Sequence, residues 1–118
     1  MIELDLPYPP SVNTYWRNVT GRTLISKKGR TYRKEMIATV AMQQPGDPLR
    51  GRLEVSVTAY PPDNRRRDLD NVLKALLDGM QHAGVYEDDS QIDHLAISRG
   101  TTKPKASRVH VRILERAQ

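Results

Sequence analysis

Residues 53–84 read LEVSVTAYPPDNRRRDLDNVLKALLDGMQHAG and decide the fold that the sequence predicts. Apolar and polar residues alternate from Leu53 to Ala59, which is typical of a strand with one buried face, and two prolines close it. Helical spacing then predicts a helix over about 71–83 that buries Val72, Leu73, Leu76, Leu77 and Met80. Gly84 stands where helices commonly end. This stretch therefore predicts a strand, a charged loop and a helix.

Further elements are predicted on both sides of this stretch. Residues 2–6 alternate apolar with acidic residues and predict a short strand, ended by prolines. A helix is predicted over about 27–43, capped by Ser26, with an apolar face of Tyr32, Met36, Ile37, Val40 and Ala41. Residues 91–99 and 107–114 predict two strands joined by a basic hairpin loop over 100–105. The predicted fold class is α+β: a single small domain, residues 1–118, whose mixed sheet has about four strands and two helices.

The composition limits the class of protein. A chain of 118 residues suffices for one core. A net charge of +5 suits a polyanion partner, although a merely basic soluble protein is an equal alternative on charge alone. The absence of cysteine excludes disulfides and thiolate metal sites. The N-terminus has no signal-peptide pattern, and no apolar run approaches the roughly 20 residues that span a bilayer, so we expect no membrane contact and a cytoplasmic location.

The charges around residue 68 change sign abruptly. Three arginines at 65–67 run directly into Asp68 and Asp70, and Lys74 follows four residues later. Alternate residues of an extended segment lie on one side, so Asp68 and Asp70 can share a cation if the backbone between them is extended. Cations hold a polyanion while carboxylates hold a metal, so this order predicts a metal-dependent phosphodiester site.

A second acidic pair, Asp88 and Asp89, precedes the strand predicted at 91–99, and strand pairing can bring it beside the start of the helix. Three carboxylates without histidine or thiolate suit Mg²⁺, with Mn²⁺ as a substitute. Such a cation activates water for phosphodiester hydrolysis. Lys74, on the same helix face as Asp70, can stabilise charge on the phosphate or protonate the leaving group.

Each of these residues also has a structural interpretation. Asp70 can be a helix N-cap, worth about 0.5–2 kcal/mol. Lys74 can pair with Asp70 or Asp78 at i, i+4, and the acids at 88–89 can be ordinary turn residues. The arginines can form a solvated loop, and the three histidines show no ligand or triad spacing.

Cations and aromatic residues alternate before and within the first turns of the 27–43 helix. Such mixtures suit base stacking and phosphate contact. Together with the three arginines, they give the candidate DNA-binding residues Tyr15, Arg17, Arg22, Lys27, Lys28, Arg30, Arg33, Arg65, Arg66 and Arg67. Alternatively, Tyr15 or Trp16 packs the loop onto the core and the cations form a solvated helix face.

The chain resembles the RusA family of Holliday-junction resolvases in the motif Arg65-Arg66-Arg67-Asp68-Leu69-Asp70-Asn71 with Lys74, followed by Ala83-Gly84 and Asp88-Asp89. The N-terminal part is similar to that family in Pro9-Pro10-Ser11, Asn13, Tyr15, Arg17, Gly21-Arg22, Ser26, Gly29 and Tyr32-Arg33. The resemblance covers most of the chain, from the first strand to about Asp93.

This resemblance implies a homodimer that binds four-way DNA junctions and cuts two opposed strands symmetrically with Mg²⁺, with a preference for CC dinucleotides, in bacteria and prophages. Carried over by position, the catalytic residues are Asp68, Asp70, Asp89 and Lys74, with the three aspartates on the metal. A two-fold dimer matches the near two-fold symmetry of a junction. The alternatives are a non-catalytic junction- or duplex-DNA-binding protein and a protein whose basic face meets an acidic partner.

Overall fold

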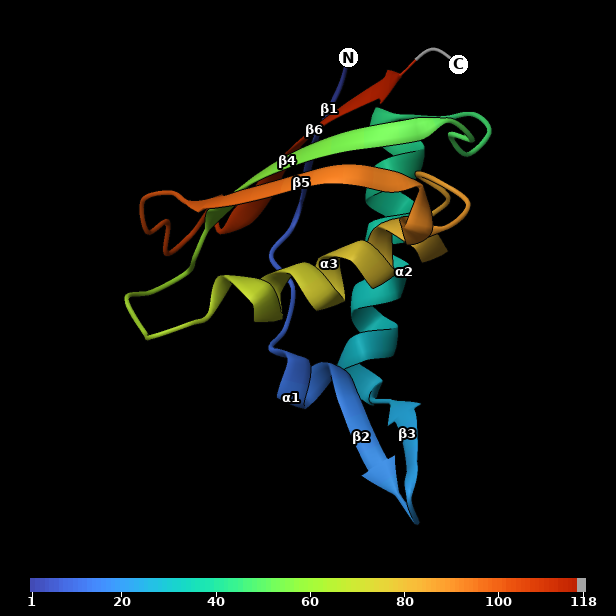
Figure 1. Ribbon diagram of the computed structural model, residues 1–118. Coiled ribbons are helices and arrows are strands. Elements are labelled where there is room, and N and C mark those ends of the chain that lie inside the picture. The colour runs from blue at the N-terminus through green and yellow to red at the C-terminus, as the bar shows by residue number, and fades with distance from the viewer. Residues whose placement is uncertain (117–118) are drawn as a thin grey trace.

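A computed structural model describes residues 1–116 and shows a four-stranded mixed sheet with helices on one face (Figure 1). The elements in chain order are β1 (Ile2–Pro7), α1 (Val12–Tyr15), β2 (Trp16–Val19), β3 (Arg22–Ile25), α2 (Lys27–Gln43), β4 (Arg52–Tyr60), α3 (Leu69–His82), the 3₁₀ helix η1 (Asp89–Gln91), β5 (Ile92–Arg99) and β6 (Arg108–Arg116). A single small α+β domain with a four-stranded mixed sheet is thereby confirmed, and α1 is a third helix that the sequence did not predict.

The strand order is β1-β6-β4-β5. β6 pairs antiparallel with both β1 and β4, whereas β4 and β5 are parallel and are connected through α3. The prediction of a hairpin over 100–105 is therefore wrong, because β5 and β6 lie on opposite sides of β4. A parallel β4–β5 pair occupies one edge of β4 and leaves the other edge for β6, where Val55 pairs with Ile113 and Val57 with Val111.

The core lies between the sheet and the two long helices. Alternate residues of β4 and β6 are at most 3% exposed, as are Met36 of α2 and Leu76 and Met80 of α3. Burial of these apolar side chains is the main stabilising contribution to the fold. The opposite face of the sheet carries polar side chains such as Glu54, Ser56 and His110.

The predicted apolar face of α2 is only partly right. Tyr32, Met36 and Val40 are buried at the expected spacing, but Ile37 is 50% exposed and Ala41 is exposed. The helix packs against α3 and β1 through a narrow stripe, so Ile37 and Ala41, which follow the buried Met36 and Val40, face solvent.

The long N-terminal loop contains a hairpin that the sequence did not predict. Strands β2 and β3 pair from Trp16 and Ile25 outward, and the turn residues Thr20 and Gly21 have φ angles of 51° and 75°. Positive φ at both central positions is the two-residue turn that matches strand twist. The hairpin projects from the body of the molecule (Figure 1). Because its composition is polar, alternation of apolar and polar residues does not predict it.

Within residues 1–116, no helix has the length and apolar character needed to cross a membrane.

Candidate nucleic-acid interface and carboxylate site

The loop between β4 and α3, residues 61–68, is called the arginine loop here. Asp63 organises it by accepting hydrogen bonds from the backbone amide of Arg65 (3.0 Å) and from Nη1 of Arg67 (2.7 Å). These two hydrogen bonds lower the pKa of Asp63 to about 2, and the bond from Arg67 contributes most. The Arg67 guanidinium also lies 5.8 Å from the centroid of the Tyr8 ring. Arg67 therefore holds the loop in shape, while Arg65 and Arg66 are exposed.

The first two predicted aspartates stand at the start of α3. The helix begins at Leu69, two residues before the predicted start, so Asp68 is the N-cap residue and Asp70 lies in the first turn. Asp68 caps no amide with its side chain, and both aspartates are exposed. Their carboxylates are therefore available to a ligand, as the functional interpretation requires.

The third predicted aspartate stands near the other end of α3. The Asp89 amide donates to Oε1 of Gln81 at 3.1 Å, which places η1 beside the last turns of the helix. Asp89 and Lys74 line one hollow of about 340 Å³ together with Asp78, Gln81, Trp16 and Leu77. The structure thus brings Lys74 and Asp89 to one surface depression.

The expectation that Asp88 and Asp89 lie beside the start of α3 is wrong for the single subunit. Because β5 runs parallel to β4, its first residues lie at the opposite end of the sheet from the arginine loop. Gln81 follows Asp70 by eleven positions along the helix, which is about 16 Å along the axis. In the part of the chain that the structure describes, no three Asp, Glu or His side chains are grouped to hold a metal ion. The donors are of the right chemical type for a hard cation, but one subunit does not assemble them.

The two neighbouring acids before β5 have opposite electrostatic environments. Burial raises the pKa of Asp89, and Asp88 and Asp78 add to that rise. The Ser90 amide, which donates to Asp88 at 2.9 Å, lowers the pKa of Asp88. Asp88 closes a capping box with Gln91 and so has a structural role, whereas the crowding of Asp89 by acids suits a position that receives positive charge.

One candidate DNA-binding residue, Tyr15, is buried, and a second, Arg33, is held in an ion pair within the protein. Tyr15 is fully buried, so the alternative that it packs the loop onto the core is confirmed. Arg33 donates from Nε and Nη2 to the two carboxylate oxygens of Asp78, at 2.9 and 3.2 Å. Tyr15 donates to the same carboxylate. The sequence indicates only Lys74 as a partner of Asp78, because nothing in the local pattern shows a contact 45 residues away.

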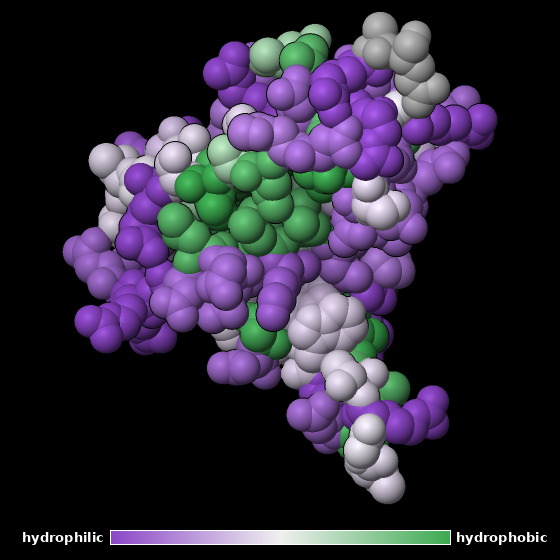
Figure 2. All heavy atoms as spheres, viewed as in Figure 1, coloured by the Kyte–Doolittle hydropathy of each residue, from purple (hydrophilic) through white to green (hydrophobic). Residues whose placement is uncertain are grey.

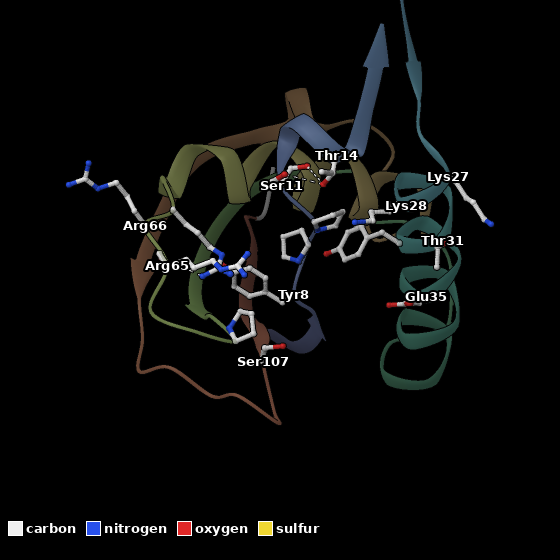
Figure 3. Close-up of a pocket in the computed structure, with 15 residues that line it drawn as sticks. Tyr8, Ser11, Thr14, Lys27, Lys28, Thr31, Glu35, Arg65, Arg66 and Ser107 are labelled. Carbon is white, nitrogen blue, oxygen red and sulfur yellow. Dashed lines mark hydrogen bonds between the residues drawn. The ribbon is translucent and has the colours of Figure 1, made fainter. Parts of the chain in front are cut away.

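The remaining candidates are exposed in two places. Arg17 and Arg22 lie on the projecting hairpin, and Lys27, Lys28 and Arg30 lie at the start of α2. Lys27 and Lys28 line a hollow of about 840 Å³ whose other wall is the arginine loop (Figure 3). Cations that are almost 40 residues apart in sequence therefore surround one depression. This is the arrangement expected of a surface that binds a polyanion.

Comparisons with known proteins show the family to which the chain belongs. A family model described as Endodeoxyribonuclease RusA matches residues 7–114. A protein named Crossover junction endodeoxyribonuclease rusA, from Enterobacteria phage HK97, is 46% identical over 110 residues, which cover 93% of this chain and 91% of that protein. Proteins of the same name from Shigella sonnei and Escherichia coli K12 are 37% and 36% identical over 101 residues, 85% of this chain and 84% of theirs. The chain belongs to the RusA family of endodeoxyribonucleases.

Proposed function

We propose that this chain is a structure-selective endonuclease that resolves four-way DNA junctions by paired, symmetric nicks, in DNA recombination and repair. The observation that supports it most is the continuity of the cationic hollow with the start of α3. Arg66 and Arg67 line both the hollow with Lys27 and Lys28 and the adjacent one that contains Asp68. A phosphate backbone held by these cations passes directly beside a proposed catalytic carboxylate. We place this activity in the cytoplasm of a bacterium or of a phage-infected host.

The proposed catalytic residues are Asp68, Asp70, Lys74 and Asp89. Lys74 lies one turn after Asp70 on an exposed face of α3, so its ammonium can reach a phosphate held at the start of the helix. There it offsets charge that accumulates on the phosphate and can protonate the leaving oxygen. Arg65, Arg66, Lys27 and Lys28 position flanking phosphates, so affinity should fall as salt rises.

Membership of the RusA nuclease family implies a requirement for a divalent metal. We propose that the metal is Mg²⁺, with Mn²⁺ as a substitute, because the donors at Asp68, Asp70 and Asp89 are carboxylates. A single subunit keeps Asp89 apart from the other two aspartates, so residues of more than one subunit would be needed to hold the cation with all three.

We propose that the chain works as a homodimer. A two-fold dimer matches the near two-fold symmetry of a four-way junction and carries one site for each strand that is cut. A second subunit also offers the acids that one subunit leaves apart. The surface that supports this lies between β5 and α3, where Figure 2 shows an apolar area. It contains Leu95, which is 39% exposed, and the half-buried Leu73, Leu77 and Ile97.

The test is cleavage of a labelled four-way junction by the variants Asp68→Asn, Asp70→Asn and Asp89→Asn. Each should lose at least 100-fold in cleavage rate in Mg²⁺ and still bind the junction, because only a ligand and not a phosphate contact is changed. Asp47→Asn, an exposed acid in the turn before β4, is the matched control and should cut normally. Undiminished cleavage by the three variants contradicts the assignment. Tight binding without cleavage by the unmodified chain indicates a non-catalytic junction-binding protein instead.

A further inference from the structure

Tyr8 stands where three surface hollows meet. It lines the cationic hollow of about 840 Å³, the hollow of about 330 Å³ that contains Asp68, and a third that contains Asp63 and Arg99. Two prolines, Pro9 and Pro10, follow it along the wall shared by the first two hollows. The segment 8–10 therefore lies between the cationic hollow and the adjacent hollow of Asp68 and lines both.

The cationic hollow combines an apolar wall with charged sides. Figure 3 shows the Tyr8 ring on the wall beside Arg65, with Lys28 opposite on α2, pointing into the hollow. Lys27 and Arg66 point away from it in the same view. One carboxylate, Glu35, is among the lining residues. The volume lies in the range of sites that enclose small ligands, and the chemistry fits a flat apolar group attached to an anion.

The Tyr8 side chain is positioned at the hollow with a ring face and a hydroxyl that can contact a ligand. Its side chain is half-buried, with the Arg67 guanidinium 5.8 Å from the ring centroid. Its hydroxyl forms no hydrogen bond within residues 1–116, unlike those of Tyr15, Tyr32 and Tyr86. Arg67 thus holds the ring in place, and no hydrogen bond within residues 1–116 draws the hydroxyl away from the hollow.

We propose that the cationic hollow receives one nucleotide from the crossover point of the junction, which leaves its base pair on binding, with its base against Tyr8 and Pro10 and its phosphate between Lys28 and Arg65. Aromatic side chains bind unpaired bases of any sequence by stacking, and lysine and arginine hold the attached phosphate. A base inside a continuous duplex must first be unstacked, whereas the crossover point of a junction offers nucleotides whose stacking is already interrupted. The hollow therefore gives a physical reason for junction selectivity, and this inference rests on the proposed function.

The test is a coupling measurement between Tyr8 and the base that fills the hollow. Junctions carry a single abasic nucleotide, moved one position at a time through the nucleotides that flank each cut, and affinity is measured with Ca²⁺ in place of Mg²⁺. At one position, removal of the base should weaken binding by roughly 5- to 150-fold, the range for one base–aromatic stack. Tyr8→Leu should weaken binding of the intact junction similarly and add nothing on that abasic junction. Tyr8→Phe, which keeps the ring, should bind almost normally.

Tyr60→Leu is the matched control, because Tyr60 also carries an arginine over its ring, Arg108 at 4.6 Å, but lies outside the hollow. Its effect should be the same on intact and abasic junctions. Lys28→Gln should reduce the slope of log affinity against log salt by about 1, whereas Lys34→Gln, exposed further along α2, should reduce it less.

Two outcomes overturn the inference. In the first, the fold-losses in affinity from Tyr8→Leu and from the abasic nucleotide multiply wherever the abasic nucleotide stands. In the second, Tyr8→Leu weakens binding to linear duplex as much as binding to the junction. In either case the unmodified chain still binds and cuts the junction, so the proposed function stands. If the unmodified chain neither binds nor cuts a junction, the proposed function and this inference fall together.

Discussion

His110 shows how one side chain ties the first and last strands together. Its ring nitrogens lie 2.9 Å from Asp5 and 3.1 Å from Glu3 on β1. These two contacts raise the pKa of His110, and the contact with Asp5 contributes most. The protonated ring therefore stabilises the folded state at acidic pH. This stabilisation is complete below the unfolded pKa of about 6.5 and is lost as pH rises through the higher folded pKa.

His110→Gln should therefore lower the melting temperature at pH 5.5 and have little effect at pH 9. Thermal unfolding across this range measures the difference, which we expect to be about 1 kcal/mol or less for a partly exposed ion pair. His94→Gln is the control, since His94 is exposed on the same face and forms no ion pair within residues 1–116. An equal loss at both pH values contradicts this account.

The site residues near the arginine loop differ in how far the sequence predicts their positions and contacts. The sequence correctly places Asp68 and Asp70 at the start of a helix, because a run of opposite charges before a helical pattern is visible locally. The expectation that they are alternate residues of an extended segment is wrong, since Asp70 already lies in the first turn of α3. Packing of Tyr15 onto the core is one of the alternatives that the sequence offers, but its contact and that of Arg33 with Asp78 are not predictable, since Asp78 comes from an element 45 residues away from Arg33.

At the scale of elements, α2 and α3 cross where Gly79 faces Tyr32. A Cβ at residue 79 would lie 2.9 Å from Cε2 of Tyr32 and 3.2 Å from Cγ of Met36. The Tyr32 ring has little freedom to move, because it is buried and its hydroxyl donates to the Pro7 carbonyl at 2.9 Å. Glycine at this position allows the two helices to approach, and α3 carries Asp70 and Lys74.

Gly79→Ala should destabilise the protein by about 1–2 kcal/mol, because overpacking outweighs the higher helix propensity of alanine. Urea unfolding gives the free energy directly. Lys34→Ala, at an exposed position of α2, is the control and should change stability by less than about 0.5 kcal/mol. A Gly79→Ala variant more stable than its parent rules out a close crossing here.

The elements themselves differ in how far the sequence predicts them. β4, α2 and α3 follow from periodicity, because each buries one face along its own length. The partner of each strand does not follow, since β5 and β6 carry equally apolar patterns and either could pair with β4 on periodicity alone. The position of Asp89 depends on that pairing: a parallel β5 begins at the far end of the sheet from α3's first turn.

At the scale of the whole molecule, β5 is an edge strand whose side chains are only partly covered. Leu95 pairs with Val55 and so points to the helix side of the sheet, yet it is 39% exposed. Exposed apolar groups on an unpaired sheet edge are a common feature of association surfaces.

If the proposed homodimer forms through this surface, Leu95→Lys should shift it to monomer and reduce junction cleavage, since a buried lysine at a two-fold interface is repeated in both subunits. Analytical ultracentrifugation measures the mass. Leu114→Lys is the matched control, because Leu114 is 41% exposed on the opposite face of the same sheet. A dimer that survives Leu95→Lys but not Leu114→Lys places the interface on the open face instead.

The most direct test of the whole account is the nick pattern on a four-way junction in Mg²⁺, compared with linear duplex of the same sequence. Each of the four strands is labelled in turn, and the cuts are mapped to the nucleotide. A junction resolvase should cut at symmetric positions in two opposed strands of the junction and should not cut the duplex. Cleavage of junction and duplex at equal rates, or nicks in a single strand, contradicts the account.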